Sequence, residues 1–378
     1  MTGAALLRDR TAIAGIGQTE FGKSVEGSEK ALACRAILAA LADAGVEPGE
    51  VDGLASYTME TTDEVDVART IGLGDLTFFA QVGYGGGAGC GVVGLAALAV
   101  ASGQANVAVA WRSRKRGSGQ RPWASRLGRL PAGLQFTRPF GLLRPVDEVA
   151  MLACRYMHEF GATRSDLGRI AVTVRAHANR NPAAVMYGKP MTLDDYLAAR
   201  WVSEPLCLFD NCLETDGALA VVIVSAERAA DLRQPPVLVH AFAQGLPQQH
   251  QTMTNYFNED PLLGPSHACA PALWRNAEFG PGDVDVAQLY DAFTPLIPLS
   301  WEGYGFCGRG EGASFDGVPY NTSGGGLSEA YVHGFNLVTE GVRQLRGTST
   351  SQVSGAQTCL VTSGEGVPTS ALLLRRAG

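Results

Sequence analysis

The pattern of apolar and polar positions near the start of the chain predicts strands that alternate with helices. The apolar run 11–17 is typical of a strand, the stretch 29–45 has the periodicity of an amphipathic helix that ends at a glycine, and 51–58 is typical of a second strand. This alternation indicates an α/β fold.

Residues 76–113 combine several strong signals in one segment. They contain a predicted strand, a glycine-rich turn, a nearly all-apolar helix that ends at about Ser102, and a β-branched strand that starts at Val107. A helix that is apolar on all sides has no face suited to water. We therefore expect this helix to be buried at the centre of the protein.

The middle of the chain departs from the alternation. Residues from about 113 to 212 are basic, proline-containing and aromatic, and we predict an inserted, largely helical loop domain there. The strand-then-helix pattern returns at 216–232, and the alternation resumes at 235. The predicted organisation is an N-terminal half at 1–234, which carries the insertion, and a C-terminal half at 235–378.

The second half repeats features of the first. Residues 323–347 and 358–364 give, in order, a glycine-rich turn, a helix and a strand, as residues 84–112 do. Two similar halves would place two helix N-termini near a shared centre. Two unrelated α/β units would give the same pattern, so the pattern alone leaves both interpretations open.

Composition narrows the class of protein. The chain has 378 residues, of which 46% are hydrophobic and 18% are charged, as in globular proteins with one large core or two domains. No apolar run approaches the roughly 20 residues that span a bilayer, and the N-terminal residues lack the order of a signal peptide. We therefore expect a cytoplasmic protein without a membrane span. The net charge of −7 argues against nucleic-acid binding.

The chain lacks the motifs of several common sites. Its 8 cysteines are dispersed and form no Cys-x-x-Cys pair, so we interpret them as reduced thiols and predict no metal site. The glycines of GIGQTEFG have the wrong spacing for a dinucleotide fingerprint, and there is no phosphate-loop, Gly-x-Ser-x-Gly or His-Glu-x-x-His motif. Composition and periodicity alone therefore predict no more than an α/β protein with a helical insertion.

Four motifs give the chain a resemblance to a known family. They are YGGGAGCGVVGLAALAVASGQANVAVA at 84–110, LYDAFTP at 289–295, NTSGGGLSEAYVHG at 321–334 and LVTSGEGVPTSALLL at 360–374. With these motifs in order over nearly its whole length, the chain resembles the thiolase superfamily. It is most similar to the lipid-transfer-protein branch, which includes aldolases that shorten steroid side chains as coenzyme A thioesters. The resemblance implies two βαβαβαββ halves that form a five-layered α/β/α/β/α core.

Other residues stand where the resemblance puts the two thiolase cysteines. The nucleophilic cysteine falls near Gly86, and the nearest thiol, Cys90, lies about one helical turn further along and is expected in the core. The second cysteine falls at about Leu360, next to Cys359. A thiolase needs a thiolate that takes up the acyl group and a second acid/base. The resemblance therefore implies an acyl-CoA-binding scaffold on which the carbon–carbon chemistry has changed.

Two tyrosines take the places of polar thiolase residues. The histidine that orients the thioester is replaced by Tyr331, just inside the helix predicted after the glycine-rich turn. The Asn-Glu-Ala-Phe element reads Tyr290-Asp291-Ala292-Phe293. A retro-aldol cleavage needs an acid/base and donors aimed at the thioester oxygen, and it needs no covalent nucleophile. We predict that Tyr331 is this acid/base.

The predicted acid/base needs a neighbour that favours its anion. An unperturbed tyrosine has a pKa near 10, and a helix N-terminus favours an anion by at most about 2 kcal/mol. Tyr290, Asp291 and His333 are the further catalytic candidates, and Tyr290 and His333 are the nearest by motif for a second contribution. Simpler interpretations stay open for each residue: a core tyrosine at Tyr331, a helix cap at Asp291 and a satisfied histidine at His333.

Backbone N–H groups are candidates for binding the thioester. Gly324 and Gly325 in one glycine-rich segment, and Ser363 and Gly364 in another, can present N–H groups to an oxyanion or to pantetheine. Tight turns explain these residues equally well.

The segment 112–129 is basic and contains no acid. By resemblance it follows the strand that leads into the loop domain, so we predict that Arg114 and Lys115 contact coenzyme A phosphates or a partner protein. A solvated basic loop is the alternative.

The resemblance implies an aldolase that acts on a β-hydroxyacyl-CoA. The expected substrate is a 17-hydroxy steroid side-chain ester, cleaved to a 17-ketosteroid and propionyl-CoA; coenzyme A is part of the substrate, and no cofactor is required. Aldolases of this branch work with a small OB-fold partner similar to the zinc-ribbon acyl-CoA-associated proteins, so we expect a homodimer core within a heterotetramer. Two other functions stay open: an acyl-CoA thiolase that uses Cys90, and a non-catalytic acyl-CoA or sterol-binding subunit.

Overall fold

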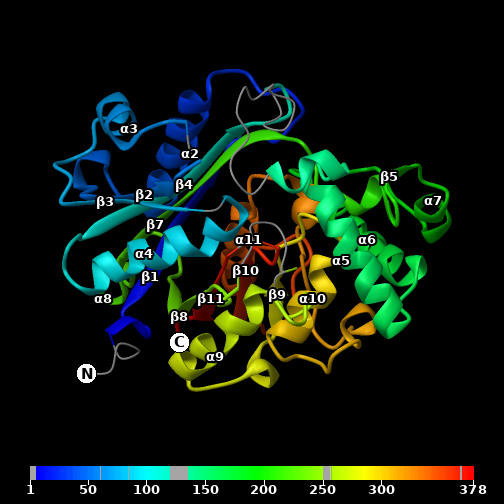
Figure 1. Ribbon diagram of the computed structural model, residues 1–378. Coiled ribbons are helices and arrows are strands. Elements are labelled where there is room, and N and C mark those ends of the chain that lie inside the picture. Colours follow the sequence, from blue (N-terminus) through cyan, green and yellow to red (C-terminus); the bar gives the residue numbers. More distant parts are fainter. Residues whose placement is uncertain are drawn as a thin grey trace.

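Nine strands form one continuous mixed sheet in the computed structural model, in the order β3-β2-β4-β7-β1-β8-β11-β10-β9 (Figure 1). The structure describes residues 6–59, 61–83, 85–119, 135–249, 256, 258–366 and 368–378. The strands of this sheet are β1 (Thr11–Gln18), β2 (Gly53–Tyr57), β3 (Phe78–Val82), β4 (Val107–Lys115), β7 (Asp216–Ser225), β8 (Val237–Gly245), β9 (Val286–Gln288), β10 (Thr358–Ser363) and β11 (Thr369–Arg376).

The two halves of the sheet repeat one pattern. In the first half β1 pairs antiparallel with β7, β7 antiparallel with β4, and β4 parallel with β2. In the second half β8, β11, β10 and β9 pair in the same way. A further parallel neighbour follows in each half: β3 beside β2, and a single bridge from Ala287 of β9 to Tyr320. The similarity seen in the sequence is therefore a repeat of the fold, joined at the centre where β1 meets β8.

The helices α4 (Gly89–Ala101) and α11 (Phe335–Arg346) hold equivalent places in the two halves. Each follows a glycine-rich segment and precedes a strand, β4 or β10. Both helices contribute to the hydrophobic cluster between the two halves. The prediction of a central, apolar helix after the first glycine-rich turn is confirmed, because α4 carries no charged side chain and nearly all of it is buried.

Helices cover both outer faces of the sheet (Figure 1). The helices α2 (Glu29–Ala44) and α3 (Glu64–Ile71) pack on the first half, and α9 (Pro265–Ala277) and α10 (Leu296–Gly303) pack on the second. Side chains of β4 alternate between two cores: Val107 and Val109 contribute to the cluster with α2, whereas Ala108 and Ala110 contribute to the central cluster. The two halves of the continuous sheet form two layers with α4 and α11 between them, so the layers are helix, sheet, helix, sheet, helix, as the resemblance implied.

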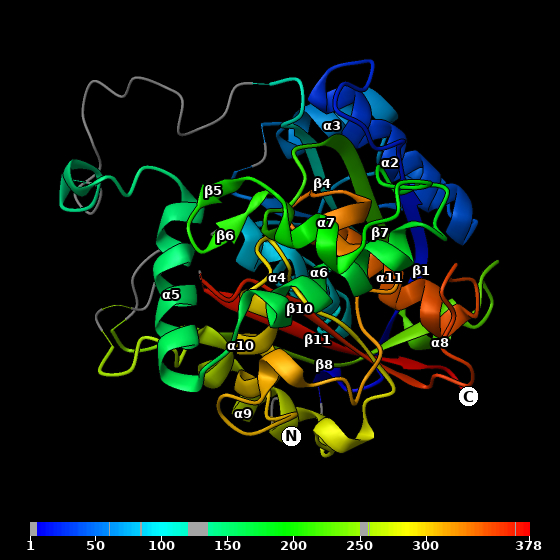
Figure 2. The same cartoon turned by 90° about the vertical axis from the view of Figure 1, so that its right-hand side faces the viewer.

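The described elements between β4 and β7 are mainly helical and lie on the right-hand side of Figure 1, the side that faces the viewer in Figure 2. β4 continues to Lys115, so the strand extends past residue 113, where the insertion was predicted to start. The elements of this region are α5 (Pro145–Phe160), α6 (Arg164–Ala178), α7 (Leu193–Leu197) and a small antiparallel pair of β5 (Trp201–Ser203) with β6 (Leu206–Cys207). The exact domain boundaries stay a prediction.

Short helical turns complete the described part of the chain. They are α8 (Ala226–Ala229), the 3-10 turns η1 (Pro48–Glu50), η2 (Gly85–Ala88), η5 (Arg138–Phe140), η6 (Leu208–Asp210), η7 (Pro281–Asp283) and η8 (Gly312–Ser314), and the π-helical turn η9 (Gly325–Glu329). No helix in the described ranges is long and apolar enough to cross a membrane.

Candidate active site

Two tyrosine hydroxyls lie in contact beside the segments that precede the central helices α4 and α11. The Oη atoms of Tyr290 and Tyr331 are 2.5 Å apart, and the two side chains are only 5% and 6% exposed. Tyr290 follows β9, and its backbone N–H donates to Thr362 Oγ1 of β10 at 2.9 Å. The backbone N–H of Tyr331 donates to Thr215 Oγ1, just before β7, at 2.9 Å. The fold therefore brings together two of the predicted site residues, both from the C-terminal half, and Thr215 of the N-terminal half anchors one of them.

The prediction that Tyr331 stands inside a helix is wrong. After the π-helical turn η9, Ala330 is extended, with φ −166° and ψ 152°, and α11 begins only at Phe335. His333 and Gly334 have φ values of 53° and 76°, a left-handed backbone that an α-helix does not contain. The dipole of a helix that starts at Tyr331 therefore cannot be invoked to favour its anion.

Gly86, where the resemblance places the thiolase nucleophile, faces the tyrosine pair. A Cβ atom built on Gly86 would lie 1.9 Å from the Tyr290 hydroxyl oxygen and 2.4 Å from its Cζ atom. Real side chains do not approach so closely, so only glycine fits while Tyr290 holds this position. The space of the missing cysteine is occupied by a phenol.

Cys90 belongs to the core, as predicted. It is fully buried in α4, its backbone N–H donates to Ser363 Oγ at 2.9 Å, and its thiol lies 3.3 Å from the Val361 carbonyl oxygen. Burial raises the pKa of the Cys90 thiol to about 12. Cys359 and Leu360 are also buried, within β10. None of these positions offers an accessible thiolate near neutral pH.

Asp291 holds the π-helical turn beside the tyrosines. Its Oδ1 accepts the Gly326 N–H at 2.7 Å, and its Oδ2 accepts the Leu327 N–H at 3.3 Å. Burial raises the pKa of Asp291 to about 6, although these N–H donors act in the opposite direction. This geometry agrees with the capping interpretation, in which Asp291 orders the backbone next to Tyr331.

One of the backbone N–H groups predicted to bind the thioester is used within the fold. The Gly324 N–H is donated to the Asn321 carbonyl oxygen at 2.9 Å, so it serves the turn and is not available to an oxyanion. Ser363 uses its hydroxyl for the contacts with Cys90. Gly325 and Gly364 have φ values of 55° and 79°, which glycine adopts without strain. Their binding role stays a prediction.

His333 lies next to Tyr331 but is engaged elsewhere. The two rings are 5.5 Å apart, and His333 Nδ1 is 2.9 Å from Arg112 Nη2. Burial, together with the charges of Arg112, Arg116 and Arg114, lowers the pKa of His333 well below its usual value. A neutral imidazole that accepts a hydrogen bond from Arg112 agrees with the interpretation of a satisfied histidine.

Arg114 and Lys115, which were predicted to contact coenzyme A, interact with other residues of the protein. Arg114 Nη1 lies 3.6 Å from Glu29 Oε1, and Lys115 Nζ donates to the carbonyl oxygens of Val25 and Gly27 at 2.5 and 2.9 Å. Residues 120–129 of the basic segment lie outside the described residues. Phosphate binding by Arg114 and Lys115 therefore stays a prediction.

Arg116 is a site residue that the sequence analysis did not single out. Its guanidinium carbon lies 5.1 Å from the centre of the Tyr331 ring. Burial raises the pKa of Tyr331 to about 12, with a smaller upward effect of Cys212, while Arg116 and the hydrogen bond from Tyr290 lower it. The basic segment 112–129 was the sequence signal for Arg116, but only the fold shows which cation of this segment lies against the tyrosines.

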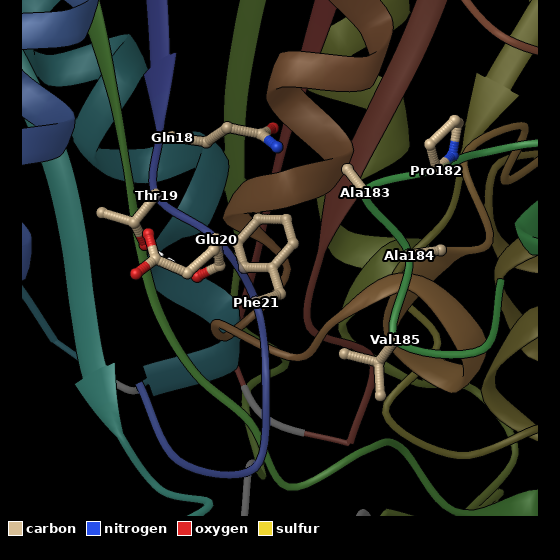
Figure 3. A pocket seen from close by; sticks show the side chains of 8 residues that line it. All are labelled: Gln18, Thr19, Glu20, Phe21, Pro182, Ala183, Ala184 and Val185. Atoms are coloured by element: carbon tan, nitrogen blue, oxygen red, sulfur yellow. Dashed lines mark hydrogen bonds between the residues drawn. The ribbon is translucent and has the colours of Figure 1, made fainter. Parts of the chain in front are cut away.

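Two cavities in the described part of the protein are not lined by either tyrosine. One, of about 580 Å³, is lined by Gln18–Phe21 at the end of β1 and by Pro182–Val185 after α6 (Figure 3). Another, of about 550 Å³, lies at the start of α9 and is lined in part by Gly264 and His267. None of the predicted site residues lines either cavity, and the described residues contain no cluster suited to a metal ion.

The chain is similar to known proteins over nearly its whole length. Residues 248–374 match the family model described as Thiolase C-terminal domain-like. The chain is 47% identical over 393 residues to a 17-hydroxy-3-oxo-4-pregnene-20-carboxyl-CoA lyase of Mycobacterium tuberculosis, with 98% of this chain and 100% of that protein covered. It is 47% identical over 389 residues to a steroid side-chain-cleaving aldolase of Thermomonospora curvata, with 98% and 99% covered.

Solved structures agree on the fold. The Ltp2-ChsH2(DUF35) aldolase superposes with a TM-score of 0.94 at 47% identity, over 98% of this chain and 99% of that chain. A human mitochondrial 3-ketoacyl-CoA thiolase in complex with CoA superposes with a TM-score of 0.70 at 15% identity, over 98% of each chain. The second similarity concerns the fold alone, and together they confirm the predicted thiolase fold.

Proposed function

This chain belongs to the thiolase superfamily, in its branch of steroid side-chain-cleaving aldolases, and from that premise we propose that it is a carbon–carbon lyase acting on a β-hydroxyacyl-CoA. The proposed substrate is a 17-hydroxy steroid side-chain CoA ester, and the products are a 17-ketosteroid and propionyl-CoA. The observation that carries the proposal is the contact between the Tyr290 and Tyr331 hydroxyls at the position of the missing nucleophile.

Retro-aldol cleavage needs only proton transfers from the protein. In the proposed reaction Tyr331, as a tyrosinate, takes the proton of the β-hydroxyl group. The oxygen then forms a carbonyl, the bond between the α and β carbons breaks, and its electron pair passes to the thioester as an enolate. Return of the proton to the α carbon gives the shorter acyl-CoA and restores the tyrosinate. Atoms and charge balance without a cofactor.

Tyr290 supports this chemistry from its place beside Tyr331. A hydroxyl that donates to a tyrosinate stabilises the anion and lowers its pKa. Burial raises the pKa of both tyrosines. We assign Tyr331 as the acid/base because it takes the place of the histidine that orients the thioester, and Tyr290 as its hydrogen-bond donor, which the 2.5 Å contact of the two hydroxyls supports.

The first experiment compares wild type with Tyr331→Phe and Cys90→Ala, using mass spectrometry of the products from a 17-hydroxy steroid β-hydroxyacyl-CoA. We expect propionyl-CoA and a ketosteroid from wild type and from Cys90→Ala. In Tyr331→Phe we expect kcat to fall by at least about 100-fold, as for other positioned acid/bases. Substrate binding should persist in Tyr331→Phe. Loss of activity in Cys90→Ala would favour a thiolase, and binding without turnover in wild type would favour a non-catalytic subunit.

The proposed assembly is a homodimer of this chain with two small partner proteins of the OB-fold and zinc-ribbon type. A DUF35 protein accompanies the similar solved aldolase, which supports a partner of that kind. The exposed edge of the sheet supports the dimer: β3 is uncharged, and its Phe79 side chain is 69% exposed. We further propose that the complex works in the cytoplasm and that coenzyme A enters only as part of the substrate.

A further inference from the structure

The tyrosine pair lacks an obvious reason to lose a proton. Both phenols are buried, and burial raises both pKa values, that of Tyr331 to about 12. A hydrogen bond between two phenols does not supply charge. A base at this place therefore needs a cation that favours the tyrosinate.

The backbone around Arg116 is fixed on both sides. On one side, the Lys115 N–H donates to Glu29 Oε1 at 3.1 Å. On the other, the N–H groups of Gly117 and Ser118 donate to Asp216 Oδ1 at 2.8 and 3.0 Å. Asp216 is buried at the start of β7 and belongs to the same sheet as β4. These bonds fix the backbone just after β4, from which Arg116 reaches Tyr331, with 5.1 Å between the guanidinium carbon and the ring centre.

Charged and titratable groups from three other segments face the pair or its cation. Cys212, before β7, raises the pKa of both tyrosines, and Glu214 of the same segment acts on Arg116. Asp291, after β9, is bound to the N–H groups of the π-helical turn. His333, before α11, is neutral and is hydrogen-bonded to Arg112.

Arg116 supplies a charge that favours the anion. Of the charged groups that the described residues place around the pair, Arg116 lowers the pKa of both Tyr331 and Tyr290. A guanidinium stays protonated at any pH at which the protein is folded. Its effect on the pair is therefore constant over the working range of pH.

We propose that Arg116 is a positioning residue of the cleavage reaction, whose fixed cation on the face of Tyr331 stabilises the tyrosinate that accepts the substrate proton. Arg116 acts through Tyr331 and needs no contact with the substrate. Its part in cleavage rests on the proposed function, whereas its effect on the ionisation of Tyr331 does not.

The direct test measures ionisation without substrate. A fluorinated tyrosine placed at position 331 ionises at lower pH than tyrosine, and its ¹⁹F resonance reports the anion in the folded protein. In Arg116→Gln we expect the ionisation midpoint to rise by roughly one to two pH units, as a charge at this distance implies. Arg35→Gln removes a surface cation paired with Glu20 and should leave the midpoint unchanged. An unchanged midpoint in Arg116→Gln, with the ¹⁹F spectrum of a folded protein, would overturn the proposal.

The second test uses the reaction. Arg116→Gln should lower kcat by roughly 10- to 100-fold near neutral pH and move the rising limb of the pH–rate profile to higher pH by the same one to two units, with little change in KM. Arg116→Lys should keep part of the activity, and guanidinium ion should partly restore Arg116→Ala. A rise in KM without a fall in kcat would mean that Arg116 binds the substrate, and this would contradict the proposal. If wild type cleaves no steroid ester while the ¹⁹F midpoint still moves, the proposed function fails and the electrostatic role of Arg116 stands.

Discussion

At the scale of single residues, the contact between Gly86 and Tyr290 leaves no room for a larger side chain at position 86. The phenol fills the space in front of the Gly86 α carbon, and its hydroxyl has a partner only because nothing protrudes from that position. The resemblance predicted both residues as departures from thiolases. Their contact could not be predicted, because it depends on how η2 and the end of β9 meet in space.

Gly86→Ala should therefore damage the site more than the fold. The added methyl must push the Tyr290 hydroxyl away from Tyr331, and displacement of a reacting group by about 1 Å can lower the rate about 100-fold. Overpacking of this kind typically costs about 1–3 kcal/mol of stability. Steady-state kinetics and thermal unfolding measure the two effects.

The matched control for this change is Gly49→Ala. A Cβ atom there meets no heavy atom within 4 Å, so activity and stability should stay near those of wild type. Wild-type turnover in Gly86→Ala would show that Tyr290 need not stand where the structure has it.

At the scale of elements, the segment between the π-helical turn η9 and α11 positions Tyr331. The sequence predicted a helix here because the spacing of apolar residues after the glycines has helical periodicity. Long-range contacts decide otherwise: the carboxylate of Asp291 binds the Gly326 and Leu327 N–H groups, and Thr215 binds Tyr331. By contrast, β1, α2, α4 and β4 could be predicted, because the spacing of apolar residues within each element already shows whether one face or both faces are buried.

Thr215→Val should loosen this segment. The Thr215 hydroxyl accepts the Tyr331 N–H and donates to the Tyr331 carbonyl oxygen at 3.2 Å, and valine, which has a similar shape, can do neither. A buried N–H without an acceptor typically costs about 1–3 kcal/mol. Denaturant unfolding should show this loss, and kcat should fall because Tyr331 is less well held. The control is Thr70→Val, on an exposed position of α3; equal stability of the two variants would mean that Thr215 does not anchor the segment.

At the scale of the whole molecule, buried carboxyl groups make stability depend on pH. Glu365 is 1% exposed, its Oε1 accepts the Ser266 hydroxyl at 2.8 Å, and its Oε2 has no hydrogen-bond partner among the described residues. Burial raises the pKa of Glu365 to about 8, against about 4.3 for an unfolded chain. Between these values the folded state binds more protons than the unfolded state, so the free energy of unfolding falls as pH rises.

Glu365→Gln should remove this dependence on pH, because an amide imitates the protonated carboxyl group. The thermal midpoint of Glu365→Gln relative to wild type should rise steadily from pH 5 to pH 8, as the carboxyl group of wild type is forced to ionise. Glu26→Gln, at an exposed position, is the control and should follow wild type. A difference in thermal midpoint between Glu365→Gln and wild type that stays constant from pH 5 to pH 8 would contradict the raised pKa of Glu365.

The open edge of β3 gives a prediction about assembly. Its sequence, FFAQV, is uncharged, and Phe79 is largely exposed at the edge of the sheet. If dimers form across this edge, Phe79→Glu should yield monomers in sedimentation velocity, because a carboxylate would be buried against its own copy. Val65→Glu changes another exposed apolar residue, on α3, and should leave the dimer intact. Dimers that persist in Phe79→Glu would place the interface elsewhere.

The contact of Gly86 with Tyr290 also bears on how such a site can arise in evolution. An ancestor with a cysteine at position 86 could not have gained Tyr290 in its present position without a collision, and the present chain cannot regain the cysteine while Tyr290 stays. The two residues are therefore epistatic: a thiol at position 86 and Tyr290 in its present place exclude each other, so a path of single mutations between the two states passes through an intermediate with neither group. Such a path makes the change of chemistry hard to reverse by single mutations.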